Sequence, residues 1–183
     1  MTADKKHKYN LVWIDMEMTG LDPEKEGIIE MASVVTDKDL SVLAEGPNLI
    51  IRQPAKLLKG MDAWNQKQHA KSGLLAEVKK SKISVKKAEK LTLDFIKKYC
   101  IPHKTVLCGS AIYHDRRCII KYMPKLNEFL HYRLIDVSTL KELMRRWYPK
   151  GKNLPKKTER HRALSDILES IEDLRYFRKH YFK

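Results

Sequence analysis

The chain has 183 residues, 43% of them hydrophobic, so it is long and apolar enough to bury the core of one domain and is unlike a disordered protein. Its net charge of +14 favours polyanionic partners, nucleic acid above all, although a merely solvated surface can carry the same surplus. No apolar stretch approaches the roughly 20 residues of a membrane helix, and the polar start shows no secretory signal. Three cysteines without C-x-x-C spacing fit a reducing compartment, which predicts a cytoplasmic protein with no membrane partner.

The first predicted strand carries the most informative residues of the chain. Residues 10–18 form an apolar run that ends before Gly20, which is typical of a strand buried in a sheet. Asp15 and Glu17 are two positions apart, so their carboxylates leave the strand on one face, roughly 6–7 Å apart. A cation bound by oxygen ligands, Mg²⁺, Mn²⁺ or Ca²⁺, would offset their repulsion. Arginine or lysine partners, or a solvated strand end, would offset it as well.

The first half of the chain continues with strands and then helices. Two β-rich segments flank a turn at residues 37–39, and together with the first strand they predict an antiparallel meander. Ser84 is expected to cap the longest helix of this half. The expected elements are strands over 28–37 and 40–52, weakly helical stretches over 61–71 and 74–80, and a helix over 85–99.

Strands alternate with helices in the second half. Pro124 is expected to end one helix and Ser138 to cap the next. The expected elements are a strand over 105–110, a helix over 115–123, a strand over 134–137, a helix from 138 through Trp147, a loop over 148–160 and a helix over 162–180. This order predicts an α/β fold with a mixed five-stranded sheet flanked by helices.

Three further polar residues stand near predicted helix starts. Asp115 precedes two arginines, and an aspartate in that setting is usually a cap or a helix-dipole partner. His161 and Asp166 open the last helix, where a lone histidine is more often a surface or capping residue than a catalyst. Taken singly, none of the three indicates catalysis.

Together with Asp15 and Glu17, these residues follow a known order. An Asp-x-Glu on the first strand, a distant Asp after a later strand and a His-x₄-Asp near the C-terminus resemble the DEDDh exonucleases, which are 3′→5′ exonucleases with a ribonuclease H-like fold. Longer phrases are similar to the oligoribonuclease family: WIDMEMTGLDPEKEGIIEMASVVTD, LAEGP, HYRLIDVSTLKELMRRW and SDILESIEDLRYFRKHYF. The resemblance starts at about residue 10, so it implies a polar N-terminal extension over 1–9 and a single exonuclease domain over 10–183.

The resemblance implies catalytic roles for five residues. Two divalent cations, Mg²⁺ or Mn²⁺, would be held by Asp15, Glu17, Asp115 and Asp166. Cations about 3.5–4 Å apart clamp the attacking and leaving oxygens of an in-line displacement. His161 would be the general base, because neutral imidazole accepts a proton near pH 7. The implied reaction hydrolyses very short oligoribonucleotides, dinucleotides especially, to nucleoside 5′-monophosphates.

The resemblance also suggests how a short RNA is held. Leu21 and Trp64 are similar to residues that wedge and stack the bases. His69, Tyr132 and Arg133 are similar to residues that cap the 5′ phosphate, with Tyr132 supplied by the second subunit of a homodimer. Without the resemblance, Trp64 would be interpreted as a core or surface aromatic, and Tyr132 and Arg133 as an ordinary strand edge.

The chain departs from the family just before the third acid. The serine that caps the 5′ phosphate in the family falls on Ala111, which has no hydroxyl. Ser110 is one position away and is expected to point elsewhere, while Tyr113 and His114 replace smaller or neutral groups. We therefore expect weaker discrimination for a 5′ phosphate than is usual in the family.

Two alternative functions stay open at this stage. A DNA proofreading or repair exonuclease would share the five catalytic residues, although the phrases around Trp64 and Tyr132 favour oligoribonuclease. A basic nucleic-acid-binding module would require four acids to gather without a function. The charge of +14 exceeds what a dinucleotide with few phosphates requires.

Overall fold

A mixed sheet of six strands forms the centre of the computed structural model, which describes residues 6–149 and 161–182. The strands are β1 (Leu11–Met18), β2 (Ile28–Thr36), β3 (Val42–Glu45), β4 (Leu49–Ile50), β5 (Val106–Gly109) and β6 (Leu134–Asp136). They lie in the order β3–β2–β1–β5–β6, with β4 paired to β2. The pairs β1–β2, β2–β3 and β2–β4 are antiparallel, whereas β1–β5 and β5–β6 are parallel.

The mixed sheet and its flanking helices are confirmed, but the sheet has six strands instead of the predicted five. The β-rich segment 40–52 forms two strands, β3 and β4, with Gly46 and Pro47 between them. Pro47 has no N–H to donate to a ladder. A side chain on Gly46 would meet Ser33 and Phe95, so the chain packs too closely there to continue as an ordinary strand.

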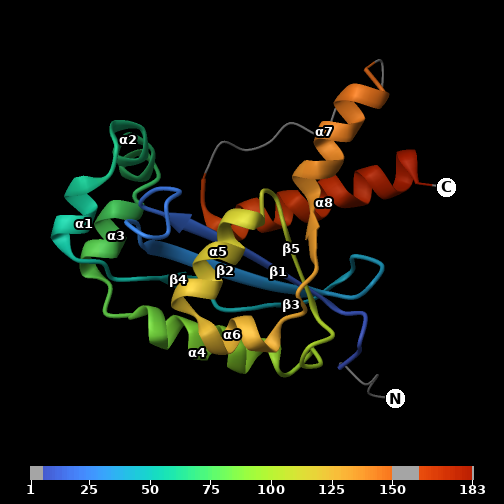
Figure 1. Cartoon of the computed structure of the whole chain (residues 1–183), viewed down its shortest axis with the longest axis horizontal. Helices are drawn as coiled ribbons and strands as arrows, with labels where there is room; N and C mark the ends of the chain where they lie inside the picture. The colour runs from blue at the N-terminus through green and yellow to red at the C-terminus, as the bar shows by residue number, and fades with distance from the viewer. Residues whose placement is uncertain (1–5, 150–160, 183) are drawn as a thin grey trace.

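Helices cover both faces of the sheet (Figure 1). One group lies on the side of α4 and α6, another comprises α7 and α8 on the opposite side, and α1–α3 gather at the end toward which β1 runs. The helices are α1 (Ala55–Gly60), α2 (Ala63–Lys71), α3 (Leu74–Lys80), α4 (Val85–Ile96), α5 (Tyr113–Tyr122), α6 (Pro124–Phe129), α7 (Val137–Trp147) and α8 (Ala163–Tyr181). No helix among the described residues is both long and apolar enough to cross a membrane.

The helix boundaries follow local capping chemistry. The Ser84 hydroxyl accepts a hydrogen bond from the Lys87 backbone N–H at 3.2 Å, so the predicted cap of α4 is confirmed. The cap of α7 is Asp136 instead of Ser138, since its carboxylate accepts from the Ser138 N–H at 2.9 Å. Pro124 follows α5 but also opens α6, a helix that the sequence did not predict, because proline suits the first helical turn. The predicted loop over 148–160 lies almost wholly outside the described residues.

Side-chain alternation along β1 decides where the functional residues point. Val12, Ile14 and Met16 are buried in the core that β1 forms with α4, α5 and α6. Trp13 is buried in a second core that includes Ile167 and other residues of α8. Because alternate residues of a strand face opposite sides, positions 15 and 17 share the side of Trp13 and face α8.

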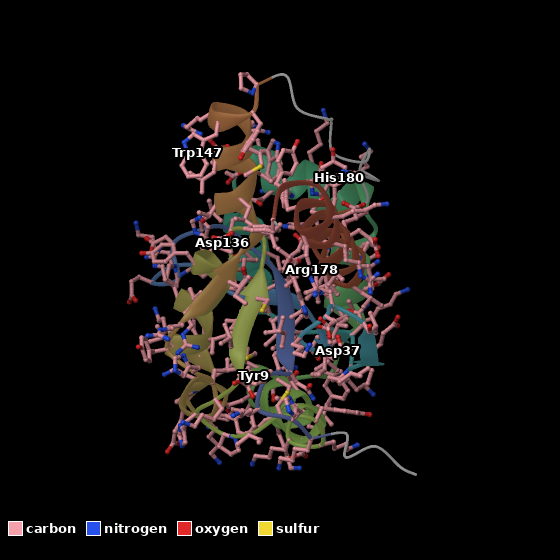
Figure 2. All side chains as sticks on the ribbon, turned by 90° about the vertical axis from the view of Figure 1, so that its right-hand side faces the viewer. Tyr9, Asp37, Asp136, Trp147, Arg178 and His180 are labelled. Atoms are coloured by element: carbon pink, nitrogen blue, oxygen red, sulfur yellow. The ribbon has the colours of Figure 1, made fainter. Side chains whose placement is uncertain are left out.

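Helix α7 extends beyond the sheet. Figure 2 shows Trp147 near the outer end of this helix and Tyr9 near the opposite end of the molecule. The Trp147 side chain is 65% exposed. Where α7 meets α8, Lys141 and Asp173 form an ion pair at 2.5 Å that is largely shielded from solvent.

Candidate active site

Three carboxylates converge between β1 and the first turn of α8. Asp15 and Glu17 leave β1 on the side that faces α8, and Asp166 lies one turn into that helix. Each carboxylate has one oxygen atom that lies within 4.8 Å of an oxygen atom of each of the other two. The sequence therefore predicted correctly that these acids, 151 positions apart at the extremes, meet in space.

Asp115 lies next to β1 as well, and it comes from the helix that follows the neighbouring strand β5. It lies in the first turn of α5, just after β5, and is 4% exposed. One of its carboxylate oxygens accepts a hydrogen bond from the Met16 backbone N–H at 2.9 Å, between the two acids of β1. Burial, and then the charge of Asp15, raise the pKa of the Asp115 carboxyl. Asp115 is thus fixed beside the cluster, although it is not one of the three acids with oxygens within 4.8 Å.

The electrostatics of this cluster favour a cation. Burial, followed by repulsion from Asp15 and Asp166, raises the pKa of Glu17 to about 8. A hard divalent cation would remove that repulsion, and carboxylate oxygens are the ligands that Mg²⁺ and Mn²⁺ prefer. The acids present therefore fit a divalent metal centre.

His161 stands immediately before α8 in a strained backbone conformation. Its φ of 44° lies in the left-handed region, which is unusual for a residue other than glycine. The imidazole lies edge-on to the indole of Trp64, with ring centroids 6.3 Å apart. The predicted general base thus lies between the start of α8, which carries Asp166, and the start of α2, which carries Trp64.

Arg162 anchors this segment and was missed by sequence reasoning. Its guanidinium Nε lies 3.1 Å from both carboxylate oxygens of Glu30, and its terminal nitrogens bond to both oxygens of Glu77. Glu30 is 0% exposed near the start of β2, so it requires a cationic partner. An isolated glutamate in a strand as apolar as IIEMASVVT was the signal that could have pointed to such a partner.

His69 is buried beside Glu17, with 2% of the residue exposed. Its Nε2 lies 3.0 Å from the Met18 backbone oxygen, and its Nδ1 lies 3.9 Å from a carboxylate oxygen of Glu17. Burial lowers the pKa of the His69 imidazole and so favours the neutral form. The predicted role of His69 at a 5′ phosphate stays a prediction.

Leu21 and Trp64 are both well exposed, at 63% and 65%. Leu21 lies in the segment between β1 and β2, and its backbone oxygen accepts a long hydrogen bond of 3.4 Å from Arg117. Trp64 is held in the first turn of α2, whose N-cap is Asp62. Two large apolar side chains left in solvent near the acids are available to a ligand.

Tyr132 and Arg133 lie far from the acids of their own chain. Both residues precede β6. The first residue of β6, Leu134, pairs with Leu107 of β5, and Leu107 pairs with Val12 of β1, so Leu134 lies at the same height in the sheet as Val12. Leu134 is itself three residues, about 10 Å, before Asp15 along the strand direction, and Tyr132 precedes it. It is 73% exposed, and the Arg133 guanidinium lies 5.4 Å from the centre of its ring.

Ser110 and Ala111 differ sharply in their surroundings. The Ser110 hydroxyl lies 3.0 Å from that of Ser170, so it is directed at α8, a contact that the sequence did not predict. Ala111 is exposed, has a φ of 53° and donates its backbone N–H to Asp136 at 3.0 Å. The position that matches the family's serine is thus open to solvent.

Comparison with known proteins shows to which family the chain is related. A family model described as Exonuclease matches residues 12–174. The chain is 53% identical to an oligoribonuclease from Ralstonia nicotianae, over 97% of this chain and 81% of that protein. It is 54% identical to an oligoribonuclease from Marinobacter nauticus, over 94% of this chain and 96% of that protein.

A solved structure shares the fold. The structure of E. coli Exonuclease I in complex with a 5cy-dT13 oligonucleotide matches 96% of this chain with a TM-score of 0.72 and 15% identity. The matched part is 42% of that longer chain, and the likeness shows the fold alone. The two oligoribonucleases are more than half identical along most of both chains, which shows a closer relationship. The chain therefore belongs to the exonuclease family and, within it, to the oligoribonucleases.

Proposed function

We propose that this chain, a 3′→5′ exoribonuclease by family, acts on very short oligoribonucleotides, dinucleotides especially, and releases nucleoside 5′-monophosphates. The convergence of Asp15, Glu17 and Asp166 within 4.8 Å is the observation that carries the proposal. Three mutually repelling carboxylates beside a buried fourth are costly to a fold that does not use them. The relatives from Ralstonia nicotianae and Marinobacter nauticus are named oligoribonucleases, which supports RNA as the substrate.

We assign the metal ligands from this geometry and the general base from the order of residues that the chain shares with its family. Two divalent cations, Mg²⁺ or Mn²⁺, would be held by Asp15, Glu17, Asp115 and Asp166. Such a pair would polarise the phosphate and lower the pKa of a bound water. His161 is assigned as the proton acceptor for the attacking water, since an imidazole can serve as a general base. Arg162 holds the segment that carries this base.

We assign the substrate contacts to two exposed side chains, Trp64 and Leu21, and to the buried His69. Trp64 stacks on one base and Leu21 wedges against the other, as their exposure permits. His69 is assigned to the 5′ end of the substrate. The Trp64 indole lies beside the His161 imidazole, so a stacked base would lie close to the group that moves the proton.

We propose a homodimer in which the partner completes the site. Tyr132 and Arg133 lie too far along the sheet to reach the acids of their own chain. Both side chains are exposed and packed on each other, which suits insertion into a second copy. A planar guanidinium can bond twice to a phosphate of the substrate held by that copy.

We place the protein in the cytoplasm, where the fragments of RNA decay arise. Cys100, Cys108 and Cys118 are free and buried, which suits a reducing compartment. We also assign residues 10–183 to a single exonuclease domain, of which the family model matches 12–174.

The test is hydrolysis of end-labelled RNAs of two to about ten nucleotides in Mg²⁺, with Asp115→Asn as the control. Fast cleavage of the dinucleotide by the natural chain, and cleavage slower by roughly 10²–10³-fold by the variant, is the expected result. A preference for long strands or for DNA would instead support a proofreading or repair exonuclease. Equal rates in the presence of EDTA would refute the metal centre.

A further inference from the structure

A lysine-rich surface lies apart from the catalytic acids. Between residues 79 and 98, every fully exposed residue is a lysine except Ser84 and Asp94. We call this surface the lysine face, and it comprises Lys79, Lys80, Lys82, Lys86, Lys87, Lys90, Lys97 and Lys98. Eight lysines against Glu89 and Asp94 give this stretch a net charge of +6, out of +14 for the whole chain.

Most of this charge has no counter-charge within the protein. Within the part of the chain that the structure describes, Lys90 is the one lysine of the face that forms an ion pair, with Asp94 at 2.5 Å. The second acid of the stretch, Glu89, is 7% exposed and accepts hydrogen bonds from the Lys125 and Leu126 backbone N–H groups at the start of α6. The opposite charge that the lysine face requires must therefore come largely from solvent ions or from a partner.

The central part of the face is an ordered helix. Helix α4 has twelve residues, about 18 Å of length, and is fixed by its Ser84 cap and by an apolar side that includes Ala88, Leu93 and Ile96. Lys86, Lys90 and Lys97 recur at four and seven positions, so they form one row along the outer side. A rigid row of charges loses less conformational entropy on binding a repeating polyanion than a disordered tail does.

The chemistry of the face favours a phosphate backbone as its ligand. Lysine is a flexible point charge that suits phosphate and does not read base edges as a bidentate arginine does. Among the described residues of this stretch no large apolar side chain is fully exposed, so the face offers nothing to insert into a lipid bilayer. Beside the face, Lys80 and Lys82 share a shallow hollow of about 480 Å³ with Glu77, so phosphate contacts are expected along α4 and not in this hollow.

The part of the lysine face that α4 carries lies on the side of the sheet opposite to the acids. In Figure 1, α4 runs along one side of the sheet and α8 along the other, and Asp15, Glu17 and Asp166 meet on the α8 side. An RNA strand on α4 therefore does not occupy the catalytic site. It would hold the enzyme near longer RNA while that site stays free for short fragments.

We propose that the lysine face binds the phosphate backbone of RNA strands longer than the substrate, without sequence preference. Such a site explains a charge that a dinucleotide does not require. The proposal does not depend on the reaction at the acids, because it predicts binding in the absence of divalent metal.

The experiment titrates the full chain against fluorescent poly-uridine RNA in EDTA, over a series of salt concentrations. We expect Lys86→Glu/Lys97→Glu to bind roughly tenfold more weakly and to reduce the slope of log affinity against log salt by about 1.4, which is ~0.7 for each phosphate that is no longer neutralised. Its dinucleotide hydrolysis in Mg²⁺ should equal that of the natural chain, which also proves that the variant is folded.

The matched control is Lys38→Glu/Lys179→Glu, which changes the net charge equally on exposed positions outside the face. This variant should bind poly-uridine almost as the natural chain does. Equal weakening of the two variants would overturn the proposal, because net charge alone would then explain binding. Displacement of poly-uridine by a non-hydrolysable dinucleotide would overturn it too, since the strand would then occupy the catalytic site. So would binding of phosphatidylserine vesicles without binding of RNA.

Discussion

Glu17 on β1 and Glu30 on β2 are direct cross-strand partners, so two glutamates occupy neighbouring positions where β1 ends and β2 begins. Glu30 is neutralised by the Arg162 guanidinium at 3.1 Å. Glu17 has Asp15 and Asp166 as neighbours instead, and its pKa is raised to about 8. The protein thus supplies the counter-charge of one glutamate and leaves that of the other to a cation.

The ion pair of Arg162 supports both the fold and the site. Arg162→Ala would leave Glu30 fully buried without its cation, which should lower the free energy of unfolding by about 3–5 kcal/mol. It should also lower kcat more than it raises KM, because the segment with His161 and Asp166 loses its anchor. Urea denaturation and steady-state kinetics on a dinucleotide measure the two effects.

Arg178→Ala is the control for this prediction. Arg178 pairs with Asp39 at 2.8 Å on the surface, so its loss should change the free energy of unfolding by less than about 1 kcal/mol. A double variant, Arg162→Ala/Glu30→Gln, should recover stability, since no buried charge is left unpaired. Similar losses for the two arginine variants would contradict the assigned role of Arg162.

The metal-free protein should become less stable as pH rises. The pKa of Glu17 is raised from 4.5 to about 8 in the folded chain, so protonated Glu17 favours folding. This contribution is fully present below pH 4.5, is lost as pH rises through about 8, and is on the order of 5 kcal/mol. Thermal unfolding in EDTA at a series of pH values measures it.

Two comparisons isolate Glu17 from other titrating groups. Glu17→Gln should remove most of the pH dependence in EDTA. Saturating Mg²⁺ should reverse its sign for the natural chain, because cations compete with protons for the carboxylates. A melting temperature in EDTA that rises from pH 5 to 8 and matches that of Glu17→Gln would contradict the assigned electrostatics.

Asp115→Asn should separate activity from stability. The amide oxygen can keep the hydrogen bond from the Met16 N–H, while the charge that Asp15 opposes is removed. The metal-free variant should therefore melt at a higher temperature than the natural chain at pH 8. Its activity should fall roughly 10²–10³-fold, as is typical when one electrostatic stabiliser of a transition state is lost. A variant less stable in EDTA would show that Asp115 is a structural residue.

Trp64→Ala should weaken substrate binding without unfolding the protein. Stacking contributes roughly 1–3 kcal/mol per base, so KM for a dinucleotide should rise roughly 5- to 150-fold. The side chain is 65% exposed, so the free energy of unfolding should change little. Tyr9→Ala removes an aromatic ring that is 55% exposed at the end of the molecule opposite α7, and its KM should be unchanged.

Ala111→Ser should increase the preference for a 5′ phosphate. The position is exposed, and a hydroxyl there would restore the residue type that the family uses. The ratio of kcat/KM for 5′-phosphorylated and 5′-hydroxyl dinucleotides should rise several-fold, by about 1 kcal/mol for one hydrogen bond. Ser110→Ala is the control, because the Ser110 hydroxyl is directed at Ser170 and its loss should leave the ratio unchanged.

Much of the fold follows from periodicity and capping. The alternation along β1 fixed the shared side of Asp15 and Glu17, and the cap at Ser84 located the start of α4. The cap of α7 was placed two residues late, because Asp136 and Ser138 are both good cap residues and local sequence does not decide between them. Helices of six residues such as α1 and α6 were missed, since two turns carry too little periodicity to detect.

Of the candidate site, too, only a part could be predicted from the sequence. Its acids could be assigned from their order in the chain, because the resemblance gives that order. The fork between Arg162, Glu30 and Glu77 joins three elements distant in sequence, and no local pattern predicts such a contact. The position of Tyr132 relative to the acids likewise required the register of β6 and β5.

The start of α8 has a consequence for when the enzyme is able to cleave RNA. Asp166 comes from this last helix, whereas Asp15 and Glu17 come from the first strand. Since translation proceeds from the N-terminus, a growing chain that ends before α8 lacks the third acid of the cluster. The site that these three acids form is therefore completed only late in synthesis.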